Sequence, residues 1–259
     1  MSDLVHLTVA EVAFLELDDP PLNLITGRLL GELDAALATL EAAAPGDVRA
    51  VVVSGAGERA FSVGSNVKEF ETHRASGGRE RFELEARVAQ RLANLPMPTI
   101  AAIEGDALGG GLEVALCCDL RVASEQAKLG LPEVHLAVTP STGGTQRLPR
   151  IVGIARAKEL LLTGRIIDAA EAHRIGLVNE VVASGQAVGR ARAIGAEIAE
   201  RGPLAVRAVK ALADGAFDRS LADGHADEVD TSVRIFATDD LLEGARSFVE
   251  KRPPTYHGR

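Results

Sequence analysis

Residues 98–133 read PTIAAIEGDALGGGLEVALCCDLRVASEQAKLGLPE, and the rest of the chain is arranged around this stretch. The apolar run at 99–103 predicts a strand, and the three glycines at 109–111 then begin a predicted helix. Glycines at a helix start leave backbone N–H groups bare and let a ligand approach closely. Those N–H groups lie at the positive end of the helix dipole. The stretch therefore predicts a site for an anion or a developing negative charge.

Two glutamates follow these glycines. Glu113 lies about one helical turn past the middle glycine, in a run that is otherwise apolar. A carboxylate there must be paired, protonated or functional. Glu133 comes further along, directly after Pro132. The two carboxylates indicate acid–base chemistry beside the anion site. The alternative, that both are ordinary glutamates and one pairs with an arginine such as Arg147, stays open on these residues alone.

A second glycine-containing turn, at 63–65, also follows a predicted apolar strand, at 48–54. Two backbone N–H groups that converge on one oxygen form an oxyanion hole, where removing a donor costs on the order of 100- to 1000-fold in rate. For either turn taken alone, a glycine that only permits a tight turn is the simpler interpretation. Residues 71–79 are polar and rich in small side chains, which predicts a loop over a site.

The alternation of apolar strands and helices up to residue 182 predicts an α/β fold. The strands are short and their connections uneven, which fits a doubly wound sheet poorly. Beyond residue 184 only helical spacing remains. We therefore predict a core over 1–195 and a helical region over 196–259, too thinly apolar to form a core of its own. Helices of that kind commonly pack on a partner subunit.

The composition excludes several classes of protein. A net charge of −9 argues against nucleic-acid binding, which needs a basic face, and the absence of Trp leaves no ladder for stacking bases. No apolar segment is long enough to span a membrane and no secretory leader is evident, so we expect no membrane association. Cys117 and Cys118 are adjacent, which favours buried reduced thiols in a cytoplasmic protein. Arginine far outnumbers lysine, a bias typical of a GC-rich bacterial genome.

Four other motifs fit the sequence less well. In a dinucleotide fingerprint, G-x-G-x-x-G, Gly109 and Gly111 match the first two positions but Val114 occupies the third. Ser65 lacks the G-x-S-x-G context of a serine hydrolase, and no phosphate-binding Gly-Lys-Ser/Thr occurs. The histidines show no helical metal spacing, so no metal site is predicted.

Taken in order, the motifs resemble those of the enoyl-CoA hydratase/isomerase (crotonase) superfamily, over nearly the whole chain. The matching segments are Asp19–Pro20 with Asn23, AFSVGSN at 60–66, Gly105, LGGGLE at 108–113, Cys118–Asp119, LPE at 131–133, GGTQRL at 143–148 and FVEKR at 248–252. The resemblance implies a crotonase-like spiral of ββα repeats with a C-terminal helical trimerisation region. It implies a homotrimer or a homohexamer, built as a dimer of trimers.

The resemblance also implies a reaction of fatty acid metabolism. An enoyl-CoA hydratase, a lyase, adds water reversibly across the C2=C3 double bond of a trans-2-enoyl-CoA thioester. It needs no cofactor, because coenzyme A is part of the acyl-CoA substrate. The superfamily also contains Δ3,Δ2-enoyl-CoA isomerases, which need only one base, and a non-catalytic acyl-CoA-binding subunit is a third possibility. Two intact glutamates weigh against both alternatives.

Carried over by motif, the resemblance assigns seven residues. The backbone N–H groups of Ser65 and Gly110 correspond to the oxyanion hole, and Glu113 and Glu133 to the catalytic glutamates. In this assignment Glu113 orients and deprotonates water, whereas Glu133 supplies the proton to C2. The three residues implied in coenzyme A binding are Lys68, near the pyrophosphate, and Phe248 and Lys251, which reach the adenosine end in a neighbouring subunit.

The sequence departs from the family pattern at two places. The family usually has Ala-Asp where this chain has Ser65 and Asn66, so the N–H donor is kept but a negative charge is lost. Residues 138–142 also differ from the usual Pro-Gly-Ala. Both departures are expected to tune the choice of substrate.

Overall fold

The computed structural model describes residues 3–75 and 78–259. Its larger sheet has six strands in the order β1-β2-β3-β5-β7-β10. β1 and β2 form an antiparallel hairpin, and every later pairing in this sheet is parallel. The strands are β1 (Val5–Thr8), β2 (Val12–Leu17), β3 (Ala50–Gly55), β5 (Thr99–Ile103), β7 (Leu120–Ser124) and β10 (Glu180–Val182).

A second sheet of four short strands has the order β4-β6-β8-β9, with β4, β6 and β8 parallel and β9 antiparallel. These strands are β4 (Ala60–Ser62), β6 (Asp106–Leu108), β8 (Lys128–Gly130) and β9 (Ile167–Asp168). Three times, a strand of the larger sheet is followed by a strand of the smaller one and then by helix. This repetition is the predicted spiral of ββα units, and it brings the ends of β4, β6 and β8 to one edge.

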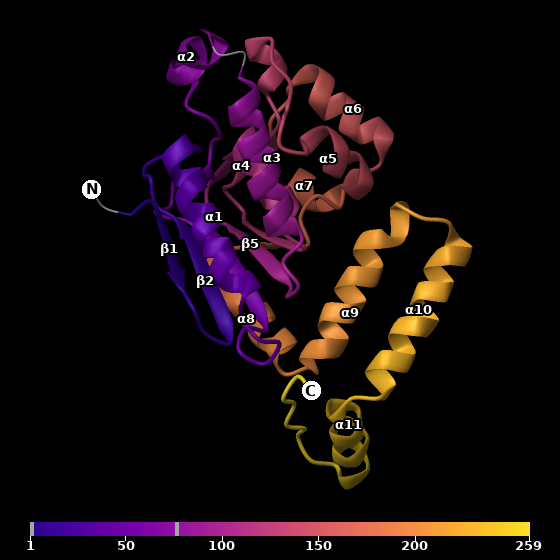
Figure 1. Cartoon of the computed structure of the whole chain (residues 1–259). Helices are drawn as coiled ribbons and strands as arrows, with labels where there is room; N and C mark the ends of the chain where they lie inside the picture. Colours follow the sequence, from indigo (N-terminus) through magenta and orange to yellow (C-terminus); the bar gives the residue numbers. More distant parts are fainter. Residues whose placement is uncertain (1–2, 76–77) are drawn as a thin grey trace.

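Helices cover both faces of the larger sheet (Figure 1). Side chains alternate along a strand, so Val51 and Val53 of β3 join the main core under α1, α3 and α4, whereas Val52 faces the smaller core under α8. β3 and β5 are buried on both faces, which explains their continuous apolar sequences. The helices of the core are α1 (Gly27–Glu41), α3 (Arg79–Ala93), α4 (Gly110–Cys117), α5 (Gly144–Val152), α6 (Ile154–Thr163), α7 (Ala169–Arg174) and α8 (Ala187–Ala199).

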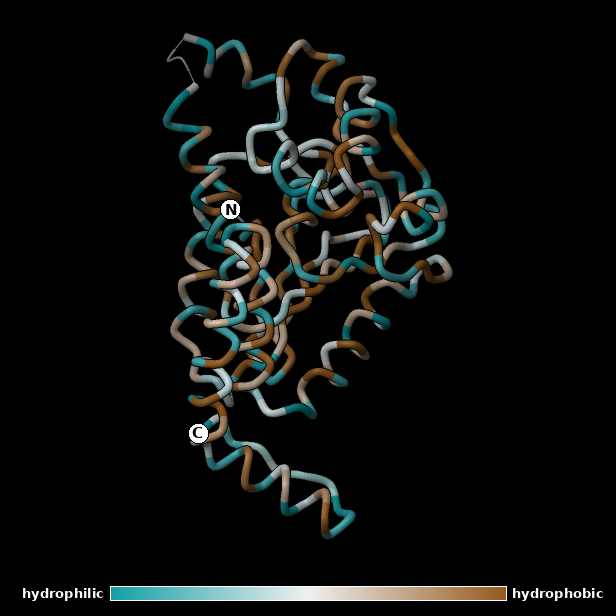
Figure 2. The backbone as a smooth tube through the Cα atoms, turned by 90° about the vertical axis from the view of Figure 1, so that its right-hand side faces the viewer, coloured by the Kyte–Doolittle hydropathy of each residue, from teal (hydrophilic) through white to brown (hydrophobic). Residues whose placement is uncertain are grey.

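Three further helices form a C-terminal arm, α9 (Pro203–Asp214), α10 (Leu221–Phe236) and α11 (Asp239–Glu250). α9 and α10 form a hairpin that stands away from the core, and apolar segments recur along the arm (Figures 1 and 2). Lys210 of α9 forms an ion pair with Asp119 and ties the arm to the core. The predicted boundary at 195/196 falls inside α8, which packs on the larger sheet. The division into two domains stays a prediction.

One local prediction is wrong. The segment expected to be a loop over 71–79 is largely helical, because α2 (Phe70–Ala75) directly continues the short 3-10 helix η1 (Val67–Glu69), and α3 begins at Arg79. Residues 76 and 77 lie outside the described part of the chain. Among the helices described, none is both long and apolar enough to cross a membrane.

Candidate active site

A single cavity of about 900 Å³ brings together the four residues predicted for the reaction centre, Ser65, Gly110, Glu113 and Glu133. The opposite wall belongs to α1 and α3 and is mostly apolar. Its apolar residues include Leu30, Leu33, Phe82, Val88, Ala89 and Leu92. The cavity therefore joins a polar end, where two turns and two carboxylates meet, to an apolar end that suits a hydrocarbon chain.

The two glycine turns meet across the polar end. A Cβ atom on Gly64, whose φ is +83°, would lie 2.7 Å from the Gly110 nitrogen, and one on Gly110 would lie 3.9 Å from the Ser65 nitrogen. Only a residue without a side chain lets the turns approach so closely. Within the described residues, neither the Ser65 nor the Gly110 N–H donates to a protein acceptor. Since α4 begins at Gly110, the positive end of its dipole adds to the two donors.

Glu113 is buried in the first turn of α4 and is held by backbone amides. Its Oε1 accepts hydrogen bonds from the N–H groups of Thr142 and Gly144, both at 2.7 Å. Burial raises the pKa of the Glu113 carboxyl, and the two amide hydrogen bonds oppose that rise. Arg147 donates to Gln90 at 3.4 Å, so among the described residues the alternative in which one of the two glutamates pairs with Arg147 is not the arrangement found.

Glu133 begins the short 3-10 helix η2 (Glu133–Leu136) and lies in a different environment. A Cβ atom on Gly109 would lie 3.3 Å from its Oε1, so the carboxylate is beside the glycine turn. Its Oε2 is buried and has no hydrogen-bond partner among the described residues. Burial, and secondarily the negative charge of Glu113, raises the pKa of Glu133 to about 7. A carboxyl group with that pKa exchanges protons readily at neutral pH.

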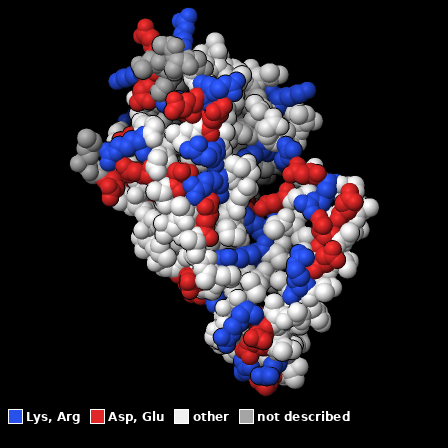
Figure 3. All heavy atoms as spheres, viewed as in Figure 1, with Lys and Arg blue, Asp and Glu red and all other residues white. Residues whose placement is uncertain are grey.

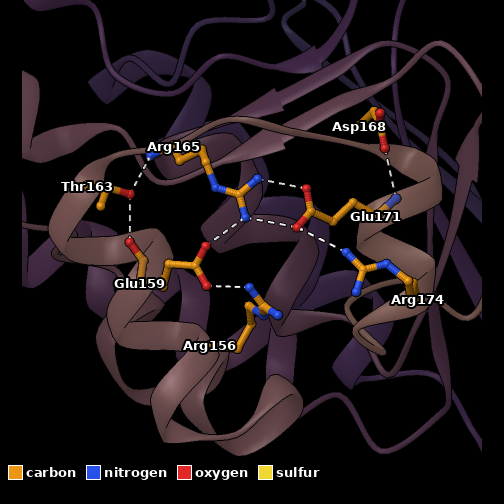
Figure 4. Close-up of polar contacts among 7 residues, drawn as sticks. All are labelled: Arg156, Glu159, Thr163, Arg165, Asp168, Glu171 and Arg174. Carbon is orange, nitrogen blue, oxygen red and sulfur yellow. Dashed lines mark hydrogen bonds and ion pairs between the residues drawn. The ribbon is translucent and has the colours of Figure 1, made fainter.

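The segment that carries Glu133 is held by a contact between His135 and the end of α6. The ring Nε2 of His135, in η2, lies 3.0 Å from the Thr163 carbonyl at the end of α6. Figure 4 shows Arg165, just beyond that end, reaching both Glu159 of α6 and Glu171 of α7. This ion-pair network, whose residues also include Arg156 and Arg174, connects α6 to α7.

The sequence model of the family described as enoyl-CoA hydratase/isomerase matches residues 8–259 of this chain. The chain belongs to the enoyl-CoA hydratase/isomerase family. This membership accounts for the paired glycine turns, because the corresponding motifs lie at both of them.

Individual members of the enoyl-CoA hydratase/isomerase family are similar over most of their length. A crotonyl-CoA hydratase of Syntrophomonas wolfei is 41% identical over 209 residues, which are 81% of this chain and 80% of the relative. A short-chain-enoyl-CoA hydratase of Clostridium acetobutylicum is 38% identical and covers 93% of this chain and 92% of its own. The crystal structure of an enoyl-CoA hydratase from Bacillus anthracis superposes with a TM-score of 0.95 at 39% identity, covering 99% of this chain and 100% of that one.

The three residues assigned to coenzyme A are not gathered at this cavity. Lys68 is exposed on η1, between Val67 and Phe70 in the segment that lines the cavity. Phe248 and Lys251 lie at the end of α11 in the C-terminal arm, exposed and outside the cavity lining. Their predicted contact with a neighbouring subunit's ligand stays a prediction.

Sequence reasoning missed the amides that hold Glu113. The glycine-rich turn around Gly143 and Gly144 was visible in the sequence, but its partner lies about 30 residues earlier in the chain. Sequence reasoning also missed Arg81 and Glu85 of α3, which line the same cavity. In the sequence both belong to an ordinary amphipathic helix rich in charged residues. Across the described residues, no group of His, Cys, Asp and Glu side chains is arranged to hold a metal ion.

Proposed function

We propose that this protein is an enoyl-CoA hydratase that adds water reversibly across the C2=C3 double bond of a trans-2-enoyl-CoA thioester. One observation carries the proposal. Two carboxylates with contrasting environments, Glu113 and Glu133, flank two converging backbone N–H groups at the polar end of one cavity. Relatives that bear the names crotonyl-CoA hydratase and short-chain-enoyl-CoA hydratase support it.

In the proposed complex, the thioester carbonyl oxygen accepts hydrogen bonds from the N–H groups of Ser65 and Gly110. This polarisation makes C3 electrophilic and stabilises the enolate that forms when water adds. A donor of this kind contributes on the order of 100- to 1000-fold in rate. The positive end of the α4 dipole favours the same negative charge. The acyl chain extends toward the apolar wall made by α1 and α3.

The two glutamates divide the proton transfers. The amides of Thr142 and Gly144 occupy Oε1 of Glu113 and fix the carboxylate, which leaves Oε2 to orient water and accept its proton as the oxygen bonds to C3. Glu133, with a pKa of about 7, donates its proton to C2. The roles reverse in dehydration. Both directions need one proton shared by the pair, so the carboxyls titrate as a unit.

The test is direct. Hydration of crotonyl-CoA, or of a longer trans-2-enoyl-CoA, removes the conjugated enoyl-thioester absorbance, and we expect that absorbance to fall when the protein is added. Incubating a trans-2-enoyl-CoA in heavy-oxygen water separates this activity from isomerisation, because hydration incorporates the label into the product and isomerisation does not. Saturable binding without turnover at any chain length would instead indicate an acyl-CoA-binding subunit.

We also propose that the chain assembles as a homotrimer, or as a homohexamer made of two trimers. None of the residues described in α10 is buried. Along the α9–α10 hairpin, six large apolar side chains are between 63% and 77% exposed. A monomeric protein rarely exposes so many apolar side chains on one element. The six are Val209, Phe217, Leu221, Val229, Val233 and Phe236. Light scattering should give three or six times the 27.1 kDa chain mass.

Figure 3 shows a hollow between the core and this hairpin, bordered by charged side chains. Its volume is about 1290 Å³, large enough to receive helices of another copy. In such an assembly the exposed Phe248 and Lys251 could reach the coenzyme A of a neighbour, and Lys68 that of its own site.

We further propose that the reaction uses no cofactor beyond the coenzyme A of its substrate, because adding water to a double bond transfers no electrons. A bacterial cytoplasmic location is proposed from the free, buried thiols of Cys117 and Cys118, which suit a reducing compartment. The net charge of −9 supports the absence of a nucleic-acid partner.

A further inference from the structure

An ion pair that the proposed mechanism does not use lies in the wall of the catalytic cavity. Arg81 and Glu85 are one turn apart on α3, with Nε and Oε1 separated by 3.0 Å, and their side chains are only 8% and 5% exposed. Both line the cavity. Removing two charges from water costs several kcal/mol per ion, and their attraction offsets this only with good geometry and further hydrogen bonds. The further hydrogen bonds of Arg81 and Glu85 therefore indicate which parts of the site the pair holds in place.

Arg81 reaches the turn that carries the oxyanion donor. Its Nη2 donates to the Ile25 carbonyl at 3.0 Å. Ile25 forms a parallel β-bridge with Ser65, and its own N–H donates to the Gly64 carbonyl at 2.9 Å. Ile25 therefore connects the Arg81 guanidinium to the backbone that carries the Ser65 N–H.

A second route runs from Arg81 to the same turn through Glu69. Arg81 Nη1 lies 3.1 Å from Glu69 Oε2, and Glu69 Oε1 accepts a hydrogen bond from the Asn66 side-chain amide, also at 3.1 Å. Asn66 directly follows Ser65. Its Oδ1 also accepts from the Lys68 N–H at 3.2 Å. An aspartate, which the family usually has at this position, could not donate to Glu69, so the asparagine suits this connection.

Glu85 connects the pair to the other half of the site. Its Oε2 accepts a hydrogen bond from the Ser141 hydroxyl at 3.4 Å. Ser141 directly precedes Thr142, whose N–H donates to Glu113. Glu85 also bears on Glu113 through space, because its negative charge contributes to raising the pKa of that carboxyl.

We propose that Arg81, with Glu69 and Glu85 as its partners, is a positioning residue that holds the Ser65 turn and the 141–144 segment, whose amides fix Glu113, in one mutual geometry. The inference rests on the proposed function and adds residues to it. An oxyanion donor and a water-activating carboxylate must act on one substrate at once, and a misplacement of about 1 Å can cost roughly 100-fold in rate. The two halves come from segments about 75 residues apart. α3 connects them directly.

The first test replaces Arg81 with Met and uses Arg79→Met as its control. Arg79 forms an ion pair of the same i,i+4 spacing on the same helix, with Glu83, but 83% of its side chain is exposed. For Arg81→Met we expect kcat for hydration to fall about 10- to 100-fold while KM changes less than about threefold. Arg79→Met should leave both constants unchanged. Arg81→Met with a kcat within twofold of the parent would overturn the proposal.

A spectroscopic measurement separates positioning from simple loss of stability. Acetoacetyl-CoA has no double bond to hydrate, and its enolate absorbs in the ultraviolet where the keto form does not. The fraction enolised in the bound state at fixed pH reports the oxyanion donors. We expect Arg81→Met to lower the enolised fraction at saturating acetoacetyl-CoA. Arg79→Met should give the same enolised fraction as the unmodified protein. An unchanged fraction would show that the Ser65 turn does not depend on Arg81.

If Arg81→Met fails to fold, the isosteric Glu69→Gln and Glu85→Gln test the same connections. Each should lower kcat several-fold, and the two effects should be non-additive because both act through Arg81. Parental kcat in both would refute the network. Failure of the proposed function can be told apart from failure of this inference. If the proposed function is wrong, the unmodified protein hydrates no enoyl-CoA. The enolate measurement can still compare Arg81→Met with Arg79→Met in that case.

Discussion

Glu113 and Glu133 share one cavity and one chemical type, yet the protein holds them in opposite ways. Glu113 is on a regular helix, and two backbone amides fix one of its oxygens. Glu133 is on a single 3-10 turn, with a buried oxygen that has no partner among the described residues. Fixed amides favour the charged form of a carboxylate, whereas burial without partners favours the neutral form. In the proposed mechanism, this contrast makes Glu113 the base and Glu133 the acid.

The largest effect should come from removing the acid. Glu133→Gln keeps the shape of the side chain but cannot deliver a proton to C2, so we expect kcat for crotonyl-CoA hydration to fall about 1000- to 10,000-fold. The loss of enoyl absorbance measures the rate, and circular dichroism should show an unchanged fold. Full retained activity would remove Glu133 from the mechanism.

Glu113→Gln should have the second largest effect. The Gln carbonyl oxygen can still accept from the two amides and keep water nearby, and Glu133 can still donate its proton to C2. We therefore expect a loss of about 100- to 1000-fold in kcat. Single-turnover measurements of both variants compare them directly. If Glu113→Gln proves more damaging than Glu133→Gln, the assignment of base and acid must be exchanged.

The sequence predicts a contact in this site more readily when the two residues are close together in the chain. Glu113 and Gly110 are three residues apart, so helical geometry alone places them together, and the α/β class followed from alternating strands and helices. Glu133 and the turn at 63–65 were candidates from the sequence itself, but the family resemblance was needed to assign the roles of Ser65 and Glu133. The amides that hold Glu113 and the ion pair of Arg81 were not predicted, because they join distant segments through interactions that leave no periodic pattern.

A third effect concerns stability rather than rate. Burial raises the folded-state pKa of Glu133 to about 7, from 4.5 in an unfolded chain. The stability that this group contributes is therefore present below pH 4.5 and is lost as pH rises toward 7. We expect Glu133→Gln to melt about 2–4 °C above the parent at pH 8, and the two Tm values to converge near pH 4.5. Parallel Tm profiles across this range would contradict the raised pKa. Melting by circular dichroism at fixed ionic strength measures both.

The same pKa predicts how kcat/KM changes at the alkaline end of its pH dependence. Because both reaction directions need one proton on the pair, kcat/KM for hydration should fall as pH rises above about 7. Dehydration of the 3-hydroxyacyl-CoA should show the same fall. A kcat/KM for hydration that stays level as pH rises from about 7 to about 9 would contradict the raised pKa of Glu133.

The smallest effect should come from the ion pairs that connect α6 to α7 (Figure 4). Arg165 bonds both Glu159 and Glu171, but these three side chains are between 21% and 42% exposed, and ion pairs within reach of solvent contribute little to stability. We expect Arg165→Met to change Tm by less than about 2 °C and to leave kcat within twofold. That result would contrast with Arg81→Met, because the Arg81 side chain and its partner Glu85 are buried in the cavity wall. A large loss of kcat in Arg165→Met would show instead that Glu133 depends on this ion-pair network as Glu113 depends on its amides.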